Sequence, residues 1–176
     1  MSAGARTALY GAVFLGIFVV CLPYFAWRLD SRLSSLVAAC LGYGGLILFL
    51  SGAALASASA LYLVRRGEGT PALFDPPRRL VVAGPYQYVR QPMMAGVFAM
   101  VFGEAMWFAS PGVFLYGCLV VVLGWLFVSR VEEPGLERRF GEDYVAYKKA
   151  VPGWMPRWGK VEPDASAPGA RQPGSP

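Results

Sequence analysis

Charged residues interrupt this chain so rarely that four long apolar runs dominate its pattern. The first two runs carry no charge, the third carries only Glu104, and the fourth carries one arginine near its end. At 1.5 Å per residue, a helix of about 20 residues crosses the ~30 Å hydrocarbon core of a bilayer. Because backbone amides in lipid need internal partners, each run is predicted to be a helix. The pattern predicts an all-α integral membrane protein with four transmembrane helices, over residues 9–27, 36–64, 93–109 and 113–131.

A second periodicity follows the fourth run. Apolar and aromatic residues recur at intervals of four, four, three and four, while the positions between them are charged; they are Leu136, Phe140, Tyr144, Tyr147 and Val151. This spacing predicts a C-terminal amphipathic helix at the cytoplasmic interface, bent at Gly141. Residues 161–176 are rich in Pro, Gly and Ala and are predicted to be a disordered tail. We therefore expect a single membrane domain over residues 1–160.

Composition and charge agree with this interpretation. The chain has 176 residues, of which 56% are hydrophobic and 15% charged, and its pI is about 9.3. Lys and Arg concentrate between the second and third runs and after the fourth, which places both termini in the cytoplasm. Orientation and anionic headgroups explain the basic pI, so we expect the lipid bilayer as a partner and no nucleic acid. We expect a multi-pass protein, of a bacterial inner membrane.

The segment between the second and third runs, residues 65–91, is too long and too apolar for a plain linker. It ends in "GPYQYVRQPMMAG", which continues into the third run. Only Ser-Pro-Gly separates the third run from the fourth, which predicts an antiparallel hairpin. Such a hairpin would bring Arg90 and Gln91 beside Glu132 and Glu133. The residues alone leave two interpretations open for this polar cluster at the open end of the hairpin, called the mouth below: a binding site or interfacial ion pairing.

The chemistry of this mouth suits a zwitterionic ligand. Carboxylates accept hydrogen bonds from an ammonium, arginine and amide donors bind a carboxylate, and aromatic faces such as Tyr86 favour a sulfonium. S-adenosylmethionine carries all three groups. The chain has no histidine, and its three cysteines lie inside apolar runs without metal spacing, so no metal site is expected.

The ordered set "GPYQYVRQPMMAG", hairpin and "EEPGLERRFGEDYVAYKKAVPGWMP" resembles the superfamily of isoprenylcysteine carboxyl methyltransferases and phospholipid methyltransferases. The resemblance implies an S-adenosyl-L-methionine site on the cytoplasmic side. It implies that Glu132 holds the amino group of the cofactor with Glu133 in support, and that Tyr147 and Trp154 close the site. The remaining residues implied to bind the cofactor are Arg78, Arg79, Leu80, Val81, Gly84, Tyr86, Gln91, Pro92, Met93 and Met94. Catalytic roles are expected for Glu133, Arg90 and Arg130.

The chain departs from the typical family pattern at three positions. Gln91 stands where the family has histidine, Met94 where it has tyrosine, and Val128 in the register of an arginine that Arg130 would have to replace. We expect a methyltransferase for a lipidic or apolar acceptor, either the carboxylate of a prenylcysteine-like substrate or the amine of a phospholipid. The alternatives are a nicotinamide-dependent membrane reductase with a related C-terminal module and a non-enzymatic scaffold. Glu104 is interpreted as structural, and the sequence does not indicate the oligomeric state.

Overall fold

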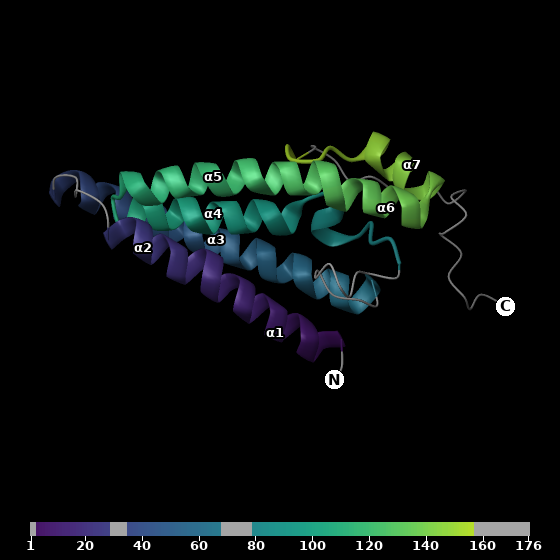
Figure 1. The fold of residues 1–176 in the computed structure, drawn as a ribbon, viewed down its shortest axis with the longest axis horizontal. Coiled ribbons are helices and arrows are strands. Elements are labelled where there is room, and N and C mark those ends of the chain that lie inside the picture. The colour runs from purple at the N-terminus through teal and green to yellow at the C-terminus, as the bar shows by residue number, and fades with distance from the viewer. Residues whose placement is uncertain (1–2, 29–34, 68–78, 157–176) are drawn as a thin grey trace.

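The computed structural model describes residues 3–28, 35–67 and 79–156, and all regular structure in these ranges is helical (Figure 1). The prediction of an all-α protein is therefore confirmed. The elements are α1 (Ala3–Leu15), the π-helical turn η1 (Gly16–Cys21), α2 (Leu22–Arg28), α3 (Ser35–Gly67), the 3₁₀ turn η2 (Gly84–Gln87), α4 (Pro92–Trp107), α5 (Pro111–Phe127), the π-helical turn η3 (Val128–Glu132), α6 (Glu133–Phe140) and α7 (Glu142–Ala150).

Three helical stretches in the described part of the chain are long and apolar enough to cross a membrane: Leu9–Arg28, Leu41–Gly67 and Pro111–Phe140. They correspond to the first, second and fourth predicted spans. The third predicted span, over residues 93–109, is helix α4, which has only 16 residues. At 1.5 Å per residue α4 is roughly 24 Å long, shorter than the ~30 Å hydrocarbon core.

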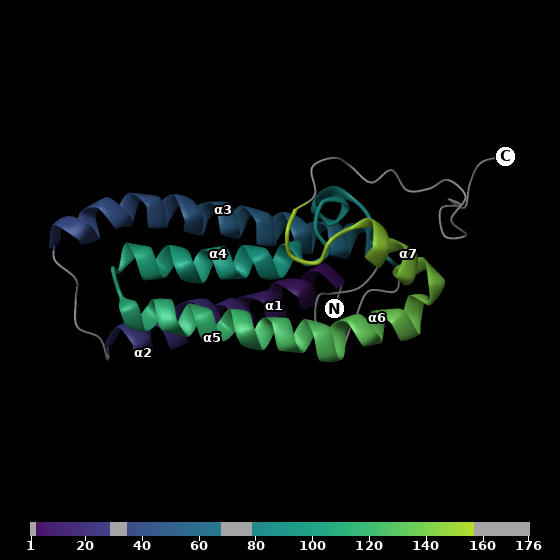
Figure 2. The same ribbon diagram turned by 90° about the horizontal axis from the view of Figure 1, so that it is seen from above.

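Successive long helices run in opposite directions, and α4 lies between α3 and α5 (Figures 1 and 2). The link from α4 to α5 is tight because Ser110 caps α5, its hydroxyl accepting a hydrogen bond of 3.1 Å from the Val113 amide. The antiparallel hairpin predicted from the short link is present. Its geometry places the first residue of α4 beside the last turn of α5.

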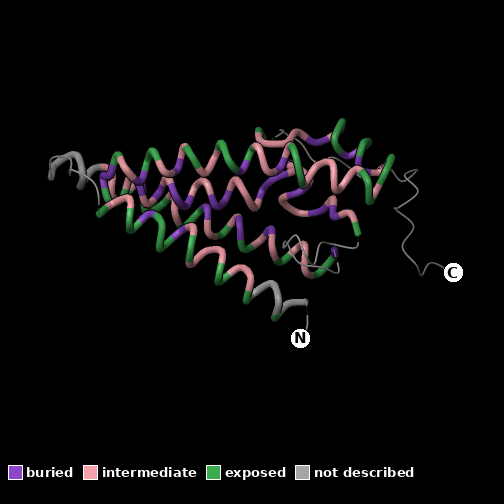
Figure 3. Tube along the Cα trace, in the orientation of Figure 1, coloured by how far each residue is buried: buried purple, intermediate pink, exposed green. Residues whose placement is uncertain are grey.

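Glycines let α3 and α4 approach until their backbones touch. A Cβ added to Gly52 would lie 2.6 Å from the Gly96 carbonyl oxygen, and one added to Gly103 would lie 2.7 Å from the Gly45 carbonyl oxygen. The side chains behind this seam form an apolar core that includes Val97 and Val101, both almost fully buried. In Figure 3 the buried positions accordingly gather along the middle of the bundle. The seam fixes α4, and with it the residues at its N-terminus.

Both π-helical turns end two residues before a proline. In η1 the Leu22 amide bonds to the Ile17 carbonyl, ahead of Pro23, and in η3 the Glu133 amide bonds to the Val128 carbonyl, ahead of Pro134. Proline removes one helical hydrogen bond and its ring clashes with a carbonyl one turn back, and the wider turn accommodates both effects. The chain therefore continues from α5 through η3 into α6, with Glu132 as the last residue of η3 and Glu133 as the first residue of α6.

The helix predicted after the fourth run is divided in two. Gly141, with φ of +53°, separates α6 from α7. The chain reverses there, so that Tyr144, Tyr147 and Val151 form one buried cluster with Leu136 and Phe140. The disordered tail predicted for residues 161–176 lies outside the described residues.

Candidate functional site

The polar residues singled out from the sequence converge where α4 begins and α5 continues into η3. The N-terminal end of α4, the turn η2, and helices α6 and α7 all lie at this end of the bundle (Figures 1 and 2). Gln91 precedes Pro92, the first residue of α4, and is 6% exposed. Its side chain forms a hydrogen bond with Glu132. The hairpin therefore joins the amide and the carboxylate across 41 positions of sequence.

Glu132 keeps unused acceptor capacity in this arrangement. An ionised carboxylate can accept about four hydrogen bonds, and a glutamine amide supplies a neutral donor. None of the ion pairs in the described ranges includes Glu132. A carboxylate that is held by a neutral amide and not neutralised by a cation is suited to receive an ammonium group from a ligand.

Glu133 is in the opposite situation, because both of its oxygens contact cations. Its Oε1 lies 2.5 Å from Arg90 Nη1, and its Oε2 lies 2.9 Å from Lys148 Nζ. Lys148 also pairs with Glu137 at 2.8 Å, and the hydrogen bonds that Lys148 donates to Glu137 and Glu133 raise its pKa. The two adjacent carboxylates therefore differ in chemistry: within the described part of the chain, Glu133 belongs to an ion-pair network, and Glu132 does not.

Arg90 ties four segments of the chain together. Its Nη1 contacts Glu133 on α6 and lies 3.4 Å from the Tyr144 hydroxyl on α7, while its Nε donates to the Val151 carbonyl at 3.0 Å. Its backbone amide donates to the Pro152 carbonyl at 2.9 Å. The neighbouring Gln91 amide donates to Gly153 at 3.2 Å, so the segment after α7 runs beside the start of α4.

The turn η2 supplies the aromatic wall of the site. Gly84 enters it with φ of +58°, and a Cβ there would lie 2.5 Å from the Tyr62 ring, so only glycine fits. Tyr86 is 8% exposed, and burial followed by the nearby charge of Glu132 raises the pKa of its hydroxyl. Its carbonyl accepts a hydrogen bond of 2.8 Å from the Tyr147 hydroxyl. Burial likewise raises the pKa of Tyr147, so both phenols stay neutral at physiological pH.

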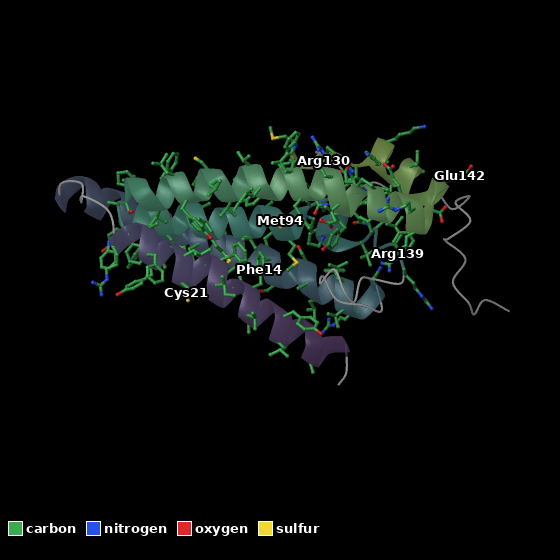
Figure 4. The ribbon with its side chains drawn as sticks, in the orientation of Figure 1. Phe14, Cys21, Met94, Arg130, Arg139 and Glu142 are labelled. Atoms are coloured by element: carbon green, nitrogen blue, oxygen red, sulfur yellow. The ribbon has the colours of Figure 1, made fainter. Side chains whose placement is uncertain are left out.

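Three other predicted site residues have contacts or exposure of their own. The Met94 methyl group would lie 2.8 Å from a Cβ at Gly124, so this side chain packs against α5 (Figure 4). Arg130 is exposed at the outer edge of η3 and forms none of the ion pairs seen among the described residues (Figure 4). Trp154 stacks on Phe98, with ring centroids 5.6 Å apart.

The remaining predicted residues have mixed environments. Val81 is buried against Tyr62, Leu80 packs into the cluster of Tyr144 and Tyr147, and Arg79 is exposed. Pro92 is buried and Met93 is half-buried, while Arg78 lies outside the described residues.

Two residues of the network were not predicted from the sequence as site residues: Tyr144 and Lys148. Tyr144 is 1% exposed and contacts Arg90. Lys148 reaches Glu133 and Glu137 only because the chain reverses at Gly141. The positive φ of one glycine determines that contact, and the helical periodicity that identified Tyr144 as apolar did not indicate its polar partner.

Comparison with known proteins places this arrangement in a family. The model of the phospholipid methyltransferase family matches residues 41–143, from the first turns of α3 to the start of α7. No curated protein and no solved structure matches the chain. The matched residues include η2, the α4–α5 hairpin and both carboxylates. The family consists of membrane methyltransferases that act on lipid-like substrates and generally use S-adenosylmethionine. The chain belongs to the phospholipid methyltransferase family, within the superfamily that also contains the isoprenylcysteine carboxyl methyltransferases.

Proposed function

We propose that this protein transfers a methyl group from S-adenosylmethionine to a lipidic or apolar acceptor at the cytoplasmic surface of the membrane. The observation that supports the proposal best is the contrast between the two adjacent carboxylates. Among the described residues, Glu132 is held by the Gln91 amide and pairs with no cation, whereas Glu133 is neutralised by Arg90 and Lys148. Interfacial ion pairing alone would have neutralised both.

The residues around Glu132 suit the chemical groups of S-adenosylmethionine. Glu132 would hold its ammonium group, and Tyr86, buried beside Glu132, offers an aromatic group close to where the ligand would lie. The cofactor supplies an activated methyl group on a sulfonium. The contribution of the protein is then to orient donor and acceptor and to exclude water, which can lower a barrier by several kcal/mol.

Arg90 and Glu133 are better suited to positioning than to direct catalysis. The Nη1 of Arg90 contacts Glu133 and Tyr144, its Nε donates to the Val151 carbonyl, and its backbone amide donates to the Pro152 carbonyl. The network holds the segment after α7 against the start of α4, next to Gln91. We assign Gln91 the role of orienting Glu132, a task that needs an amide donor and no proton transfer. The predicted roles of Arg130 and Met94 gain no support from their positions.

For the membrane, we propose a single domain over residues 1–160 with four spans, α4 being the short one. Because α4 packs between α3 and α5, its backbone is shielded from lipid even where its length falls short. The basic second loop and C-terminal segment favour a cytoplasmic location for both termini, and we propose the bacterial inner membrane as the location of the protein. The acceptor would be the amine of a phospholipid or the carboxylate of a prenylcysteine-like molecule.

The test is ligand-dependent stability of the purified protein in detergent. S-adenosylhomocysteine should raise the unfolding midpoint, since a ligand that binds only the native state stabilises it, and NADPH should not. Glu132→Gln keeps the shape of the side chain and removes its charge, so it should abolish the shift. Glu142→Gln, at an exposed carboxylate on α7, is the matched control (Figure 4). Stabilisation by NADPH alone would favour the reductase.

A further inference from the structure

A cavity separate from the Gln91–Glu132 contact lies beside the last turns of α3. Its volume is about 370 Å³, and it is lined by Leu61, Tyr62, Arg65 and Arg66. Ligand-binding pockets usually begin at ~300 Å³, so this cavity has room for a small polar group. None of its four lining residues was predicted as part of the cofactor site.

The cavity carries two adjacent positive charges. Arg65 and Arg66 are both exposed, and the ion pairs found in the described ranges involve neither of them. The Arg66 guanidinium lies 5.9 Å from the centre of the Tyr62 ring, which holds it over the aromatic face. Two guanidinium groups that line one hollow are suited to bind a phosphate, because each presents a planar set of N–H donors.

The surface next to these charges is apolar. Leu61 is 45% exposed, and further along α3 Leu50 and Ile47 are 57% and 70% exposed. All three lie in the stretch Leu41–Gly67 that is long and apolar enough to cross a membrane. A ligand that satisfies both parts of this surface has an anionic head and a hydrocarbon tail. In the proposed orientation the arginines face the cytoplasmic leaflet, where anionic phospholipids attract basic side chains.

One wall of the cavity also supports the turn η2. The Tyr62 ring packs against the buried cluster of Val81, Ala83 and Tyr86, and it occupies the space that a side chain at Gly84 would need. A ligand seated against Tyr62 would therefore press on the same ring that supports Tyr86. Binding at the cavity would stabilise the wall of the proposed cofactor site without touching the cofactor.

We propose that this cavity binds the phosphate headgroup of an anionic phospholipid through Arg65 and Arg66, with the acyl chains along the exposed apolar face of α3. The inference rests on the proposed membrane orientation and is independent of methyl transfer. A free phosphate shares the headgroup chemistry but lacks the chains. It would bind the arginines without using Leu61 or Ile47.

The experiment measures lipid binding to the full chain in detergent by native mass spectrometry and by the unfolding midpoint. Phosphatidylglycerol is compared with phosphatidylcholine and with inorganic phosphate. Removing both guanidinium charges in Arg65→Gln/Arg66→Gln should weaken phosphatidylglycerol binding by roughly 30-fold, at about fivefold for each basic residue near the headgroup. The control variant Arg138→Gln/Lys149→Gln removes two exposed charges from α6 and α7 and should bind phosphatidylglycerol like the wild type.

Each outcome decides the proposal. Equal phosphatidylglycerol affinity in the wild type and in Arg65→Gln/Arg66→Gln would overturn it. Equal stabilisation by inorganic phosphate would support the anion site and assign its ligand to free phosphate. If the double variant does not fold, the salt dependence of lipid binding to the wild type tests the proposal. Salt should weaken phosphatidylglycerol binding while leaving phosphatidylcholine unaffected, and salt-independent binding would contradict a site built on two arginines.

Discussion

Replacing Arg90 by methionine tests whether the ion-pair network holds the C-terminal segment on the bundle. Methionine keeps much of the aliphatic volume and removes every side-chain hydrogen bond. The substitution would leave the Val151 carbonyl without its donor at 3.0 Å and would remove the cation 2.5 Å from Glu133 Oε1. The Arg90 and Glu133 side chains are only 11% and 15% exposed, so water replaces these contacts poorly.

The magnitude follows from the contacts. Breaking a buried ion pair by removing one partner costs about 3–5 kcal/mol, because a charge stays buried without compensation. Glu133 keeps Lys148 as a second cation, 39% exposed, which reduces that cost. The lost hydrogen bond to Val151 adds about 1 kcal/mol. We therefore expect Arg90→Met to lower the free energy of unfolding by about 2–4 kcal/mol.

The assay is equilibrium unfolding in detergent, combined with amide hydrogen exchange at residues 90 and 91. Exchange there should accelerate in Arg90→Met, since these two amides donate to the Pro152 and Gly153 carbonyls of the segment that the Arg90 side chain holds in place. A double-mutant cycle with Glu133→Gln should return a coupling energy of at least about 1 kcal/mol. The control Arg138→Met alters an exposed arginine and should change stability by less than about 0.5 kcal/mol. The reasoning would be refuted if Arg90→Met also changed stability by less than about 0.5 kcal/mol and if the effects of Arg90→Met and Glu133→Gln simply added.

Three further predictions concern stability. Gly84→Ala should destabilise the protein by at least about 2 kcal/mol in denaturant titrations, because the added Cβ meets the Tyr62 ring and φ is positive; a neutral effect would mean that η2 is held differently. Gly52→Val should lower the thermal midpoint and separate α3 from α4, whereas the same change at Gly42, where a Cβ meets nothing within 4 Å, should be tolerated. Burial raises the pKa of Tyr86 above its ordinary value of 10.0, so the contribution of this neutral phenol to stability is complete below pH 10 and is lost as the pH rises further. Tyr86→Phe should therefore make the thermal midpoint fall less steeply with pH above 10. An unchanged slope would contradict the burial of Tyr86 as a neutral phenol.

The overall helical architecture could be predicted from the sequence because lipid and apolar core impose strong, simple patterns. Uninterrupted hydrophobic runs located α1–α2, α3 and α5 within a few residues. The hairpin followed from a three-residue link, and the hairpin alone predicted that Gln91 would meet Glu132. The short length of α4 was harder to predict, since its apolar run continues through Phe108 and Ala109 while the helix ends at Trp107.

The details of the site depended on backbone geometry that periodicity does not encode. The π-helical turn that ends at Glu132 reflects Pro134, two residues further on. That proline was visible in the sequence, but no π-helical turn was predicted from it. The pairing of Lys148 with Glu133 required the reversal at Gly141. Likewise, Met94 could be aligned with a family position, but its direction towards Gly124 comes from the small-residue packing of α4 against α5.

The most direct test of the account compares two ligands on two proteins. S-adenosylhomocysteine and its analogue lacking the amino group are titrated calorimetrically into the wild type and into Glu132→Gln. A charge-assisted hydrogen bond contributes about 1.5–3 kcal/mol, so the wild type should prefer the amino form by roughly 10- to 100-fold. The variant should bind both ligands with similar, weak affinity. If Glu132→Gln keeps the preference of the wild type, the ammonium group is held elsewhere and the assignment of Glu132 is wrong.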